Sequence, residues 1–186
     1  MAGTQRTKYG AERYFLLLIA LSFFGWLYET IFVLFQTGRI RHQGFLNSPV
    51  CPIYGTAIMA AYLLLGTPNE PRGLLKSVEN KPARTVLYLL AAFFIPSVFE
   101  LVVGLYFERR YSLMLWCYRG MPLNIYGVVC VPISLAWSLL LYGFMRWGFT
   151  PLKNAVQKIP LPAARIITVL FAALLIFDFY KNFSVL

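Results

Sequence analysis

The sequence predicts an all-α, polytopic membrane protein built from five transmembrane helices. Of its 186 residues, 59% are hydrophobic and 13% are charged, whereas soluble domains average about 45–50% and about 25%. Apolar runs approach the length of about 20 residues that a helix needs to cross a ~30 Å hydrocarbon core. The short alternating strands of a membrane β-barrel are absent from the sequence pattern. We therefore expect a single helical membrane domain over residues 1–186.

Five apolar segments account for the expected helices. They cover residues 14–36, 50–65, 85–107, 125–147 and 166–180. The second and fifth contain 16 and 15 residues, which is near the lower limit for a span. The second segment is therefore expected either to span the membrane or to re-enter it, and the sequence leaves both open. The first segment follows a basic N-terminus without a small-residue cleavage site, so it is interpreted as an uncleaved signal anchor.

The basic residues predict an orientation in the cell membrane. The side with the N-terminus and the connections at 66–84 and 146–165 carries eleven lysines and arginines, and the opposite side carries six. Cytoplasmic connections are enriched in these residues, so we expect the N-terminus in the cytoplasm and the C-terminus outside. The net charge of +10 does not indicate nucleic-acid binding, because no basic run is interleaved with stacking aromatic residues.

Landmarks recur along the chain at similar spacing. Glu29 and Glu100 are 71 residues apart, and the Ile-Tyr-Gly triplets at 53–55 and 125–127 are 72 residues apart. This favours two parallel helix-pair repeats, related by a pseudo-two-fold axis along the membrane normal. The alternative is chance similarity between apolar strings that reuse few residue types. The expected units are repeat one at about 13–66, repeat two at about 84–147 and an extra helix at about 165–181.

The acidic residues inside apolar segments mark a candidate site. A carboxylate in mid-span costs ~2.5–3.5 kcal/mol on insertion scales, and such groups usually face the bundle interior or a watered cavity. Gly25 lies one turn before Glu29, and Gly104 lies one turn after Glu100. Small residues on a carboxylate's face leave room for another helix, water or a ligand. Two roles stay open for Glu29 and Glu100: internal hydrogen-bond anchors, or groups that bind a ligand or handle protons.

Polar and aromatic side chains on the outer connections extend this candidate site. Tyr54, Asn124 and Tyr126 are expected to supply hydrogen bonds, and residues 112–122 are expected to lie at headgroup level. A third acid, Asp178, is expected to pair with Lys181 at the end of its helix. The expected ligand-binding residues are Glu29, Glu100, His42, Gln43, Tyr54, Asn124, Tyr126, Trp116 and Arg119.

The sequence assigns no catalytic residue, metal site or cofactor. His42 could act as a general base only beside an orienting carboxylate, and no motif supplies that geometry. The three cysteines have no CxxC spacing and a single histidine accompanies them, so a zinc site is not expected. Cys51 and Cys117 either pair in a disulfide or stay free. The chain has no Gly-rich phosphate loop, so it is not expected to hydrolyse ATP by itself.

A series of motifs runs in order through residues 14–145. They are Gly25-Trp26-Leu27-Tyr28-Glu29, Gly44-Phe45-Leu46, Cys51-Pro52-Ile53-Tyr54-Gly55, Phe99-Glu100, Trp116-Cys117-Tyr118 and Leu123-Asn124-Ile125-Tyr126-Gly127. This series resembles the CmpB family, small multi-span membrane proteins that carry an ABC-transporter type IV label. The resemblance implies a permease-like membrane protein and the location of its site, and it implies no particular activity.

Two stretches depart from the family's usual pattern. The family typically has Asn-Arg-Gly-Phe-Leu where this chain has His-Gln-Gly-Phe-Leu at 42–46, and Trp-Asp-Tyr-Ser where it has Trp-Cys-Tyr-Arg at 116–119. Our hypothesis is that relatives form an ion pair between these connections, which the neutral Gln43 and Cys117 replace here. Losing both charges is less harmful than losing one, because a single loss strands the partner charge.

These observations predict an integral membrane protein with an outward-facing polar site between two helix-pair repeats. Repeat interfaces with mid-membrane polar groups are where transporters place substrates, so binding or transport of a small molecule or lipid is the favoured function. One alternative is a membrane-embedded enzyme acting on lipid headgroups or a lipid-linked substrate, although no enzyme signature favours it. The other is a noncatalytic assembly subunit. The expected partners are membrane lipids and either further copies of the chain or a partner subunit.

Overall fold

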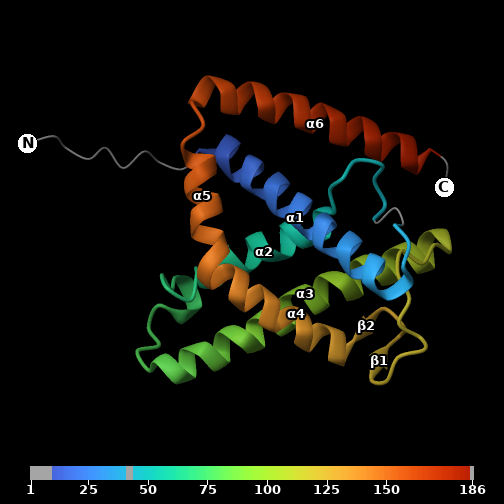
Figure 1. The fold of residues 1–186 in the computed structure, drawn as a ribbon, viewed down its shortest axis with the longest axis horizontal. Coiled ribbons are helices and arrows are strands. Elements are labelled where there is room, and N and C mark those ends of the chain that lie inside the picture. The colour runs from blue at the N-terminus through green and yellow to red at the C-terminus, as the bar shows by residue number, and fades with distance from the viewer. Residues whose placement is uncertain (1–9, 41–43, 185–186) are drawn as a thin grey trace, which may run out of the picture.

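The computed structural model describes residues 10–40 and 44–184, and helices dominate this part of the chain (Figure 1). The long helices are α1 (Ala11–Thr37), α3 (Lys81–Tyr111) and α6 (Leu161–Phe183). The shorter helices are α2 (Pro52–Leu65), the 3₁₀ turn η1 (Gly73–Leu75), α4 (Val131–Gly143), the π-helical turn η2 (Phe144–Gly148) and α5 (Phe149–Gln157). Strands β1 (Asn124–Ile125) and β2 (Val129–Cys130) form a small antiparallel hairpin.

The helices alternate in direction, which gives the molecule two distinct ends. The starts of α1, α3 and α6 gather with the ends of α2 and α5 at the left of Figure 1, and we call this the proximal end. The ends of α1, α3 and α6 and the β1–β2 hairpin lie at the right, and we call this the distal end, whereas α2 starts near the middle of α1. The connections predicted to lie on the same side of the membrane are thus at the same end of the molecule.

Three helices in the described part of the chain are long and apolar enough to cross a membrane. They are Ala11–Phe35, Lys81–Tyr111 and Leu161–Phe183, with mean hydropathies of 1.9, 2.3 and 2.0. Helix α2 has 14 residues, a length of about 21 Å, which is shorter than the hydrocarbon core. The predicted all-α, membrane-type architecture is confirmed at this level, whereas the five spans and their repeat arrangement stay predictions.

Local chemistry explains where the helices differ from the predicted segments. Helix α3 begins at Lys81 rather than residue 85, because the Asn80 side chain accepts a hydrogen bond from the Ala83 amide at 3.0 Å and so caps the helix start. Helix α4 begins at Val131 rather than Ile125, because the hairpin occupies the preceding residues. Tyr126 and Gly127 turn that hairpin with φ of 54° and 71°. The Ile-Tyr-Gly triplet at 53–55 is helical instead, so the two triplets differ in structure.

Glycines allow α1 and α2 to pack closely. A Cβ atom at Gly25 would collide with the Cβ of Tyr54, and one at Gly55 would lie 2.7 Å from the carbonyl oxygen of Leu18. Gly104 of α3 is covered in the same way by the side chains of Val128 and Trp116. The space beside Gly25 and Gly104 is thus filled by other parts of the chain, which is one of the alternatives that the sequence left open for the faces of Glu29 and Glu100.

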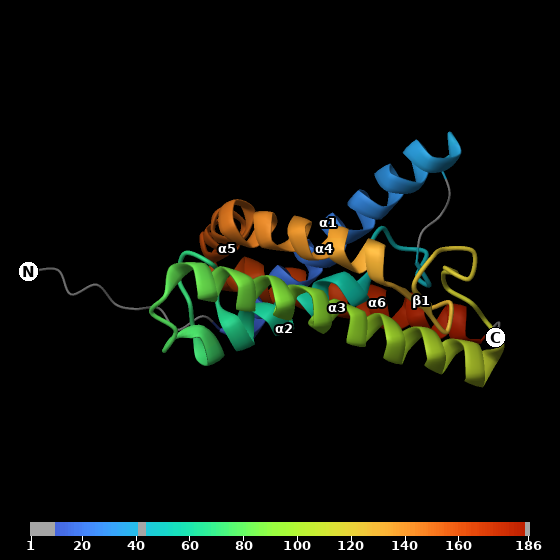
Figure 2. The same ribbon diagram turned by 90° about the horizontal axis from the view of Figure 1, so that it is seen from below.

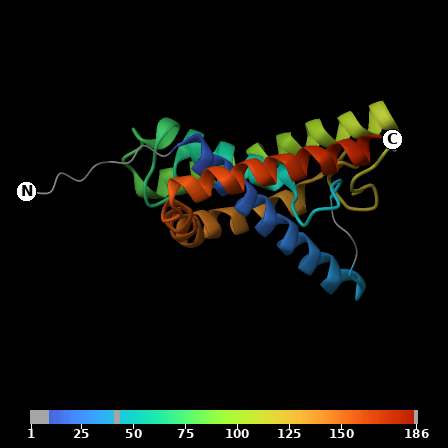
Figure 3. The same ribbon diagram turned by 90° about the horizontal axis from the view of Figure 1, so that it is seen from above.

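Apolar packing is concentrated toward the proximal end. Leu17 and Leu21 of α1 pack with residues from α2, α3 and the α4–α5 region, including Tyr88 and Phe149, in one buried cluster. The distal part of α1 leans away from the other helices, as Figures 2 and 3 show. Because the helices separate there, the distal half has room for cavities.

Candidate functional site

Three cavities, which extend from the middle of the helix bundle toward the distal end, share the side chain of Tyr54. Their volumes are about 210, 350 and 410 Å³. Glu29 lines two of them and Glu100 lines two, with one cavity in common. We call the three together the Tyr54 chamber. Two acids from helices α1 and α3 and a tyrosine from α2 thus converge on one hollow region, and their role in ligand binding stays a prediction.

The two carboxyl groups differ in how their oxygens are satisfied. The Tyr54 hydroxyl lies where it can donate a hydrogen bond to Glu29. Oε2 of Glu100 is buried and has no hydrogen-bond partner among the residues that the structure describes. The two carboxylates are close enough for electrostatic interaction. Because an unsatisfied buried acceptor loses its hydration without compensation, Glu100 is the group in the chamber that most needs a donor.

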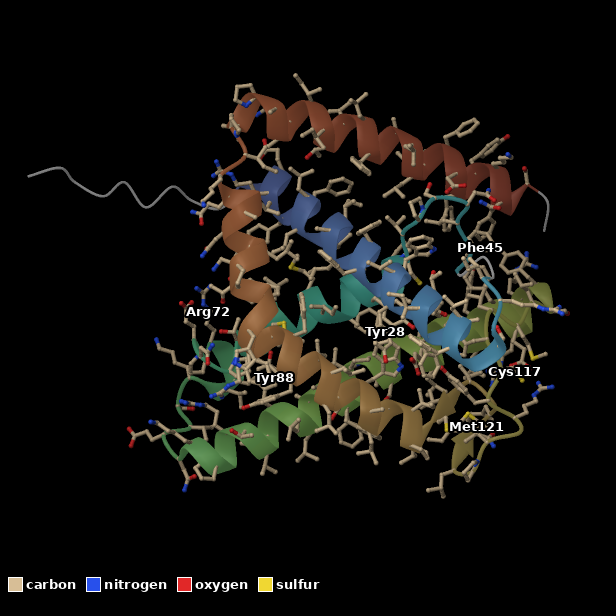
Figure 4. All side chains as sticks on the ribbon, viewed as in Figure 1. Tyr28, Phe45, Arg72, Tyr88, Cys117 and Met121 are labelled. Atoms are coloured by element: carbon tan, nitrogen blue, oxygen red, sulfur yellow. The ribbon has the colours of Figure 1, made fainter. Side chains whose placement is uncertain are left out.

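The remaining walls of the chamber are mainly aromatic. The Trp137 ring lies 4.7 Å from that of Tyr28 and 5.1 Å from that of Tyr54, measured between centroids. In Figure 4, Tyr28 lies near the middle of the molecule, and Phe45 and Cys117 lie toward the distal end. No lysine, arginine or histidine occurs among the described residues that line the three cavities. The chamber therefore combines negative or hydrogen-bonding groups with an apolar surface.

The Tyr118 hydroxyl, on the connection after α3, lies close to both acids. Burial, reinforced by the negative charges of Glu100 and Glu29, raises the pKa of the Tyr118 hydroxyl above its usual range. Tyr118 is therefore protonated at neutral pH and can act as a hydrogen-bond donor at the rim of the chamber.

The structure brings together some of the predicted site residues and separates others. Glu29, Glu100, Tyr54 and Trp116 all line the chamber. Trp116 is held by a 2.8 Å hydrogen bond from its Nε1 to the carbonyl oxygen of Val128.

Three other predicted residues belong to the hairpin region and are absent from the chamber lining. Asn124 donates to the Met121 carbonyl at 2.8 Å and accepts from the Gly127 amide at 3.0 Å, so it stabilises the turn. Tyr126 is exposed, and Arg119 forms an ion pair with Glu108.

His42 and Gln43 lie outside the described residues, and so does the hypothesis that Gln43 and Cys117 replace an ion pair. Cys51, Cys117 and Cys130 are all free thiols. Among the described residues, no three histidine, cysteine or acidic side chains gather as they would around a metal ion.

Asp178 has different partners from the one predicted. Its carboxylate accepts hydrogen bonds from the Ser48 amide at 2.7 Å and from the Asn47 amide at 3.2 Å, and Asn182 also donates to it at 2.9 Å. Lys181 forms no ion pair with it in the described structure. The acid instead ties the connection between α1 and α2 to helix α6.

Trp137, Tyr28 and Tyr118 were not among the predicted site residues, although each lines the chamber. Tyr28 precedes Glu29 and Tyr118 follows Trp116 and Cys117, so both occur within the motifs of the CmpB resemblance and could have been included. Trp137 stands in an apolar segment without a motif. Its position follows from the packing of α4 along α3, which turns this ring toward Tyr28 and Tyr54 and which the sequence pattern does not specify.

Comparison with known families decides the membership of this chain. A family model described as "Putative ABC-transporter type IV", the CmpB family, matches residues 16–183. The chain belongs to the CmpB family. The match includes every residue of the Tyr54 chamber named above, so the chamber is part of the CmpB-type domain. Neither the curated proteins nor the solved structures gave a match. Together with the three long apolar helices, CmpB membership supports a location in a membrane.

Proposed function

We propose that this CmpB-family protein binds small amphiphilic molecules in the Tyr54 chamber and takes part in their transport across or within the membrane. The ligand we infer carries an ammonium or another hydrogen-bond-donating group. The unpartnered Oε2 of Glu100 is the observation that carries the proposal. A ligand donor placed there would replace the hydration that burial removed, and hydrogen bonds to charged groups contribute about 1.5–3 kcal/mol.

The chamber walls define the rest of the ligand. Aromatic side chains such as Phe99, Phe107 and Trp137 line the cavities around the acids. Burying apolar ligand surface against them contributes about 25 cal/mol per Å². The described lining has no basic side chain, so a carboxylate or phosphate headgroup would meet like charge. An amine or alcohol attached to a hydrocarbon chain fits better.

The proposal includes a topology. The helices cross the membrane five times, with α2 and the α4–α5 region as the two short or broken crossings, and the chamber faces outward. Bends and breaks at membrane depth are tolerated where they line a cavity, and α4 passes into α5 through the π-helical turn η2. The sequence has no ATP-binding loop, so ATP hydrolysis would come from a partner subunit if transport is driven as the family description implies.

A matched series of ten-carbon ligands tests the headgroup preference. The full chain in lipid nanodiscs is titrated with decylamine, decanol and decanoate, and binding is followed by tryptophan fluorescence. We expect affinity in the order amine, alcohol, carboxylate. The variant Glu100→Gln should bind decylamine about tenfold more weakly, since the lost charged contact amounts to at least about 1.4 kcal/mol.

The control variant is Glu70→Gln, because Glu70 is exposed and lies on the connection that follows α2 at the proximal end. Decylamine binding should be unchanged in this variant. Equal affinity for all three ligands, or equal losses in both variants, would contradict the proposal. If Glu100→Gln fails to assemble, the more conservative Tyr54→Phe is used, and collapse of both variants would favour the assembly-subunit role.

A further inference from the structure

A small polar cavity at the proximal end lies apart from the Tyr54 chamber. It measures about 90 Å³ and is bounded by the connection after α2, the first turns of α3 and the junction of α4 with η2. Lys81, Arg84 and Arg146 line it together with the hydroxyl-bearing Tyr88 and Tyr142. We call this cavity the basic pocket. The described residues that line it include no acidic side chain.

Helical spacing places the two cations of α3 on the face of the helix that lines the pocket. Lys81, Arg84 and Tyr88 follow one another at intervals of three and four residues, which places them on one face of the helix. The Tyr88 hydroxyl donates to the Gly66 carbonyl oxygen at 3.2 Å. This bond fixes the floor of the pocket against the end of α2. Figure 4 shows Tyr88 at the opposite side of the molecule from Phe45 and Cys117.

The second wall is fixed by α4 and η2. Arg146 donates from Nη1 to the Tyr142 hydroxyl at 3.3 Å, and the Tyr142 and Tyr88 rings lie 5.8 Å apart in a T-shaped contact. The Asn69 side chain donates to the Arg146 carbonyl oxygen at 2.7 Å. The connection after α2 is thereby fastened to η2, and the pocket keeps its shape without a ligand.

The charges of this pocket are not balanced within the described structure. The ion pairs of the whole described structure join Arg72 to Glu70, Arg119 to Glu108 and Arg165 to Glu12. None of them involves the three cations of the basic pocket. These cations also lie near the start of α3, where the helix macrodipole is positive. Their mutual repulsion would be relieved by a bound anion.

We propose that the basic pocket is a binding site for a phosphoryl group, carried either by an anionic membrane lipid or by a dissolved phosphate. Guanidinium groups match the oxygen geometry of phosphate, and lysine contributes a further point charge. The tyrosine and threonine hydroxyls of the lining supply neutral donors.

The surface next to the pocket fits a lipid. Leu87 is exposed and lies three residues after Arg84 on α3, so an acyl chain could contact it while the headgroup contacts Arg84. The proximal end also carries the greater number of lysines and arginines, which is the cytoplasmic pattern. Anionic lipids are found in that leaflet.

Native mass spectrometry of the full chain provides the test. The protein in a zwitterionic detergent is titrated with dioleoyl phosphatidylglycerol, with dioleoyl glycerol as the phosphate-free control and with inorganic phosphate in a separate series. We expect saturable binding of phosphatidylglycerol and none of dioleoyl glycerol. Arg84→Gln and Arg146→Gln should each weaken phosphatidylglycerol binding about fivefold, since each cation contributes about 1 kcal/mol toward an anionic lipid.

Arg39→Gln serves as the matched control, because Arg39 is an exposed arginine at the distal end of the molecule. The affinity of this variant for phosphatidylglycerol should equal that of the unmodified chain. An equal loss in Arg39→Gln, or unchanged binding in Arg84→Gln and Arg146→Gln, would overturn the proposal. Arg146→Lys keeps the charge and should retain most of the affinity, which separates loss of charge from loss of folding.

The phosphate series identifies the source of the phosphoryl group. Competition by millimolar phosphate with equal sensitivity to Arg146→Gln would assign the site to a dissolved phosphate. Lipid binding without such competition would assign it to a headgroup. Glu100→Gln should bind phosphatidylglycerol normally, so failure of the chamber proposal and failure of this one give different results.

Discussion

The Asp178 carboxylate accepts two hydrogen bonds from Ser48, one from its amide at 2.7 Å and one from its hydroxyl at 2.5 Å. The acid belongs to the last helix and the serine to the first connection, 130 residues away in sequence. With 6% exposure of Asp178, water cannot readily replace these contacts. The pair therefore holds the last helix, α6, against the connection that precedes α2.

Asp178→Asn should destabilise the protein by about 1–3 kcal/mol. One of the two carboxylate oxygens would become an NH₂ group that faces donors, so at least one buried partner would be left unsatisfied. Thermal unfolding in detergent, followed by circular dichroism, measures the change. Lys181→Gln is the control from the same helix end, and its unfolding temperature should equal that of the unmodified chain. A matching loss in Lys181→Gln would instead support the ion pair expected from the sequence.

Gly55→Ala should loosen the contact between α1 and α2. The added Cβ would lie 2.7 Å from the Leu18 carbonyl oxygen and would also collide with the Ser22 side chain, so the helices must separate. Overpacking of this kind costs about 1–3 kcal/mol. Gly120→Ala is the matched control, because no atom lies within 4 Å of the position that its added methyl group would occupy. Similar unfolding temperatures for the two variants would show that the close approach is not required.

Cysteine labelling should distinguish the three thiols. Cys117 is exposed, whereas Cys51 and Cys130 are buried. A water-soluble maleimide should therefore add one label to the folded protein and three after denaturation, as counted by intact-mass spectrometry. Because Cys51 is buried, raising the pH from 7 to 9 should leave it unlabelled in the folded protein. Rapid labelling of Cys51 at pH 7 would show that the chamber opens to water.

The orientation is open to a direct test. The charge distribution predicts a cytoplasmic N-terminus and an outside C-terminus. Alkaline phosphatase fused after residue 186 should be active, and green fluorescent protein fused there should be dark. Fusions within the 76–80 connection should give the reverse result. Active phosphatase at both positions would place both outside. The helices from α3 to α6 would then cross the membrane an even number of times, which contradicts the proposed topology.

The sequence predicted the fold best where long apolar runs are separated by polar connections. Predicted segments 14–36, 85–107 and 166–180 lie within α1, α3 and α6, because long apolar runs leave few alternatives to helix. Their ends extend further than predicted, because polar residues such as Lys81 and Arg110 continue the hydrogen-bonded helix beyond the apolar run. The grouping of Glu29, Glu100 and Tyr54 followed from the helical period and the alternation of direction.

Contacts that depend on tertiary packing could not be predicted. Trp137 reaches Tyr54 because α4 packs along α3 and turns this ring toward α2, and no local pattern specifies that packing. Asp178 has Lys181 close by in sequence, yet it binds the distant Ser48 because two backbone amides are oriented toward it. The hairpin at 124–130 escaped prediction, since two residues with left-handed backbone interrupt an otherwise apolar run.

Helix α3 contributes residues to both proposed sites. Arg84 and Glu100 are 16 residues apart on it, or about 24 Å along the axis. Sites separated by more than about 7–10 Å without shared partners usually contribute independently to free energy. The rigid length of α3 thus separates the two sites. Occupying one pocket leaves affinity at the other unaltered unless α3 bends at Pro96, or unless the α4–η2 wall shifts, because it supplies Phe144 to the chamber and Arg146 to the basic pocket.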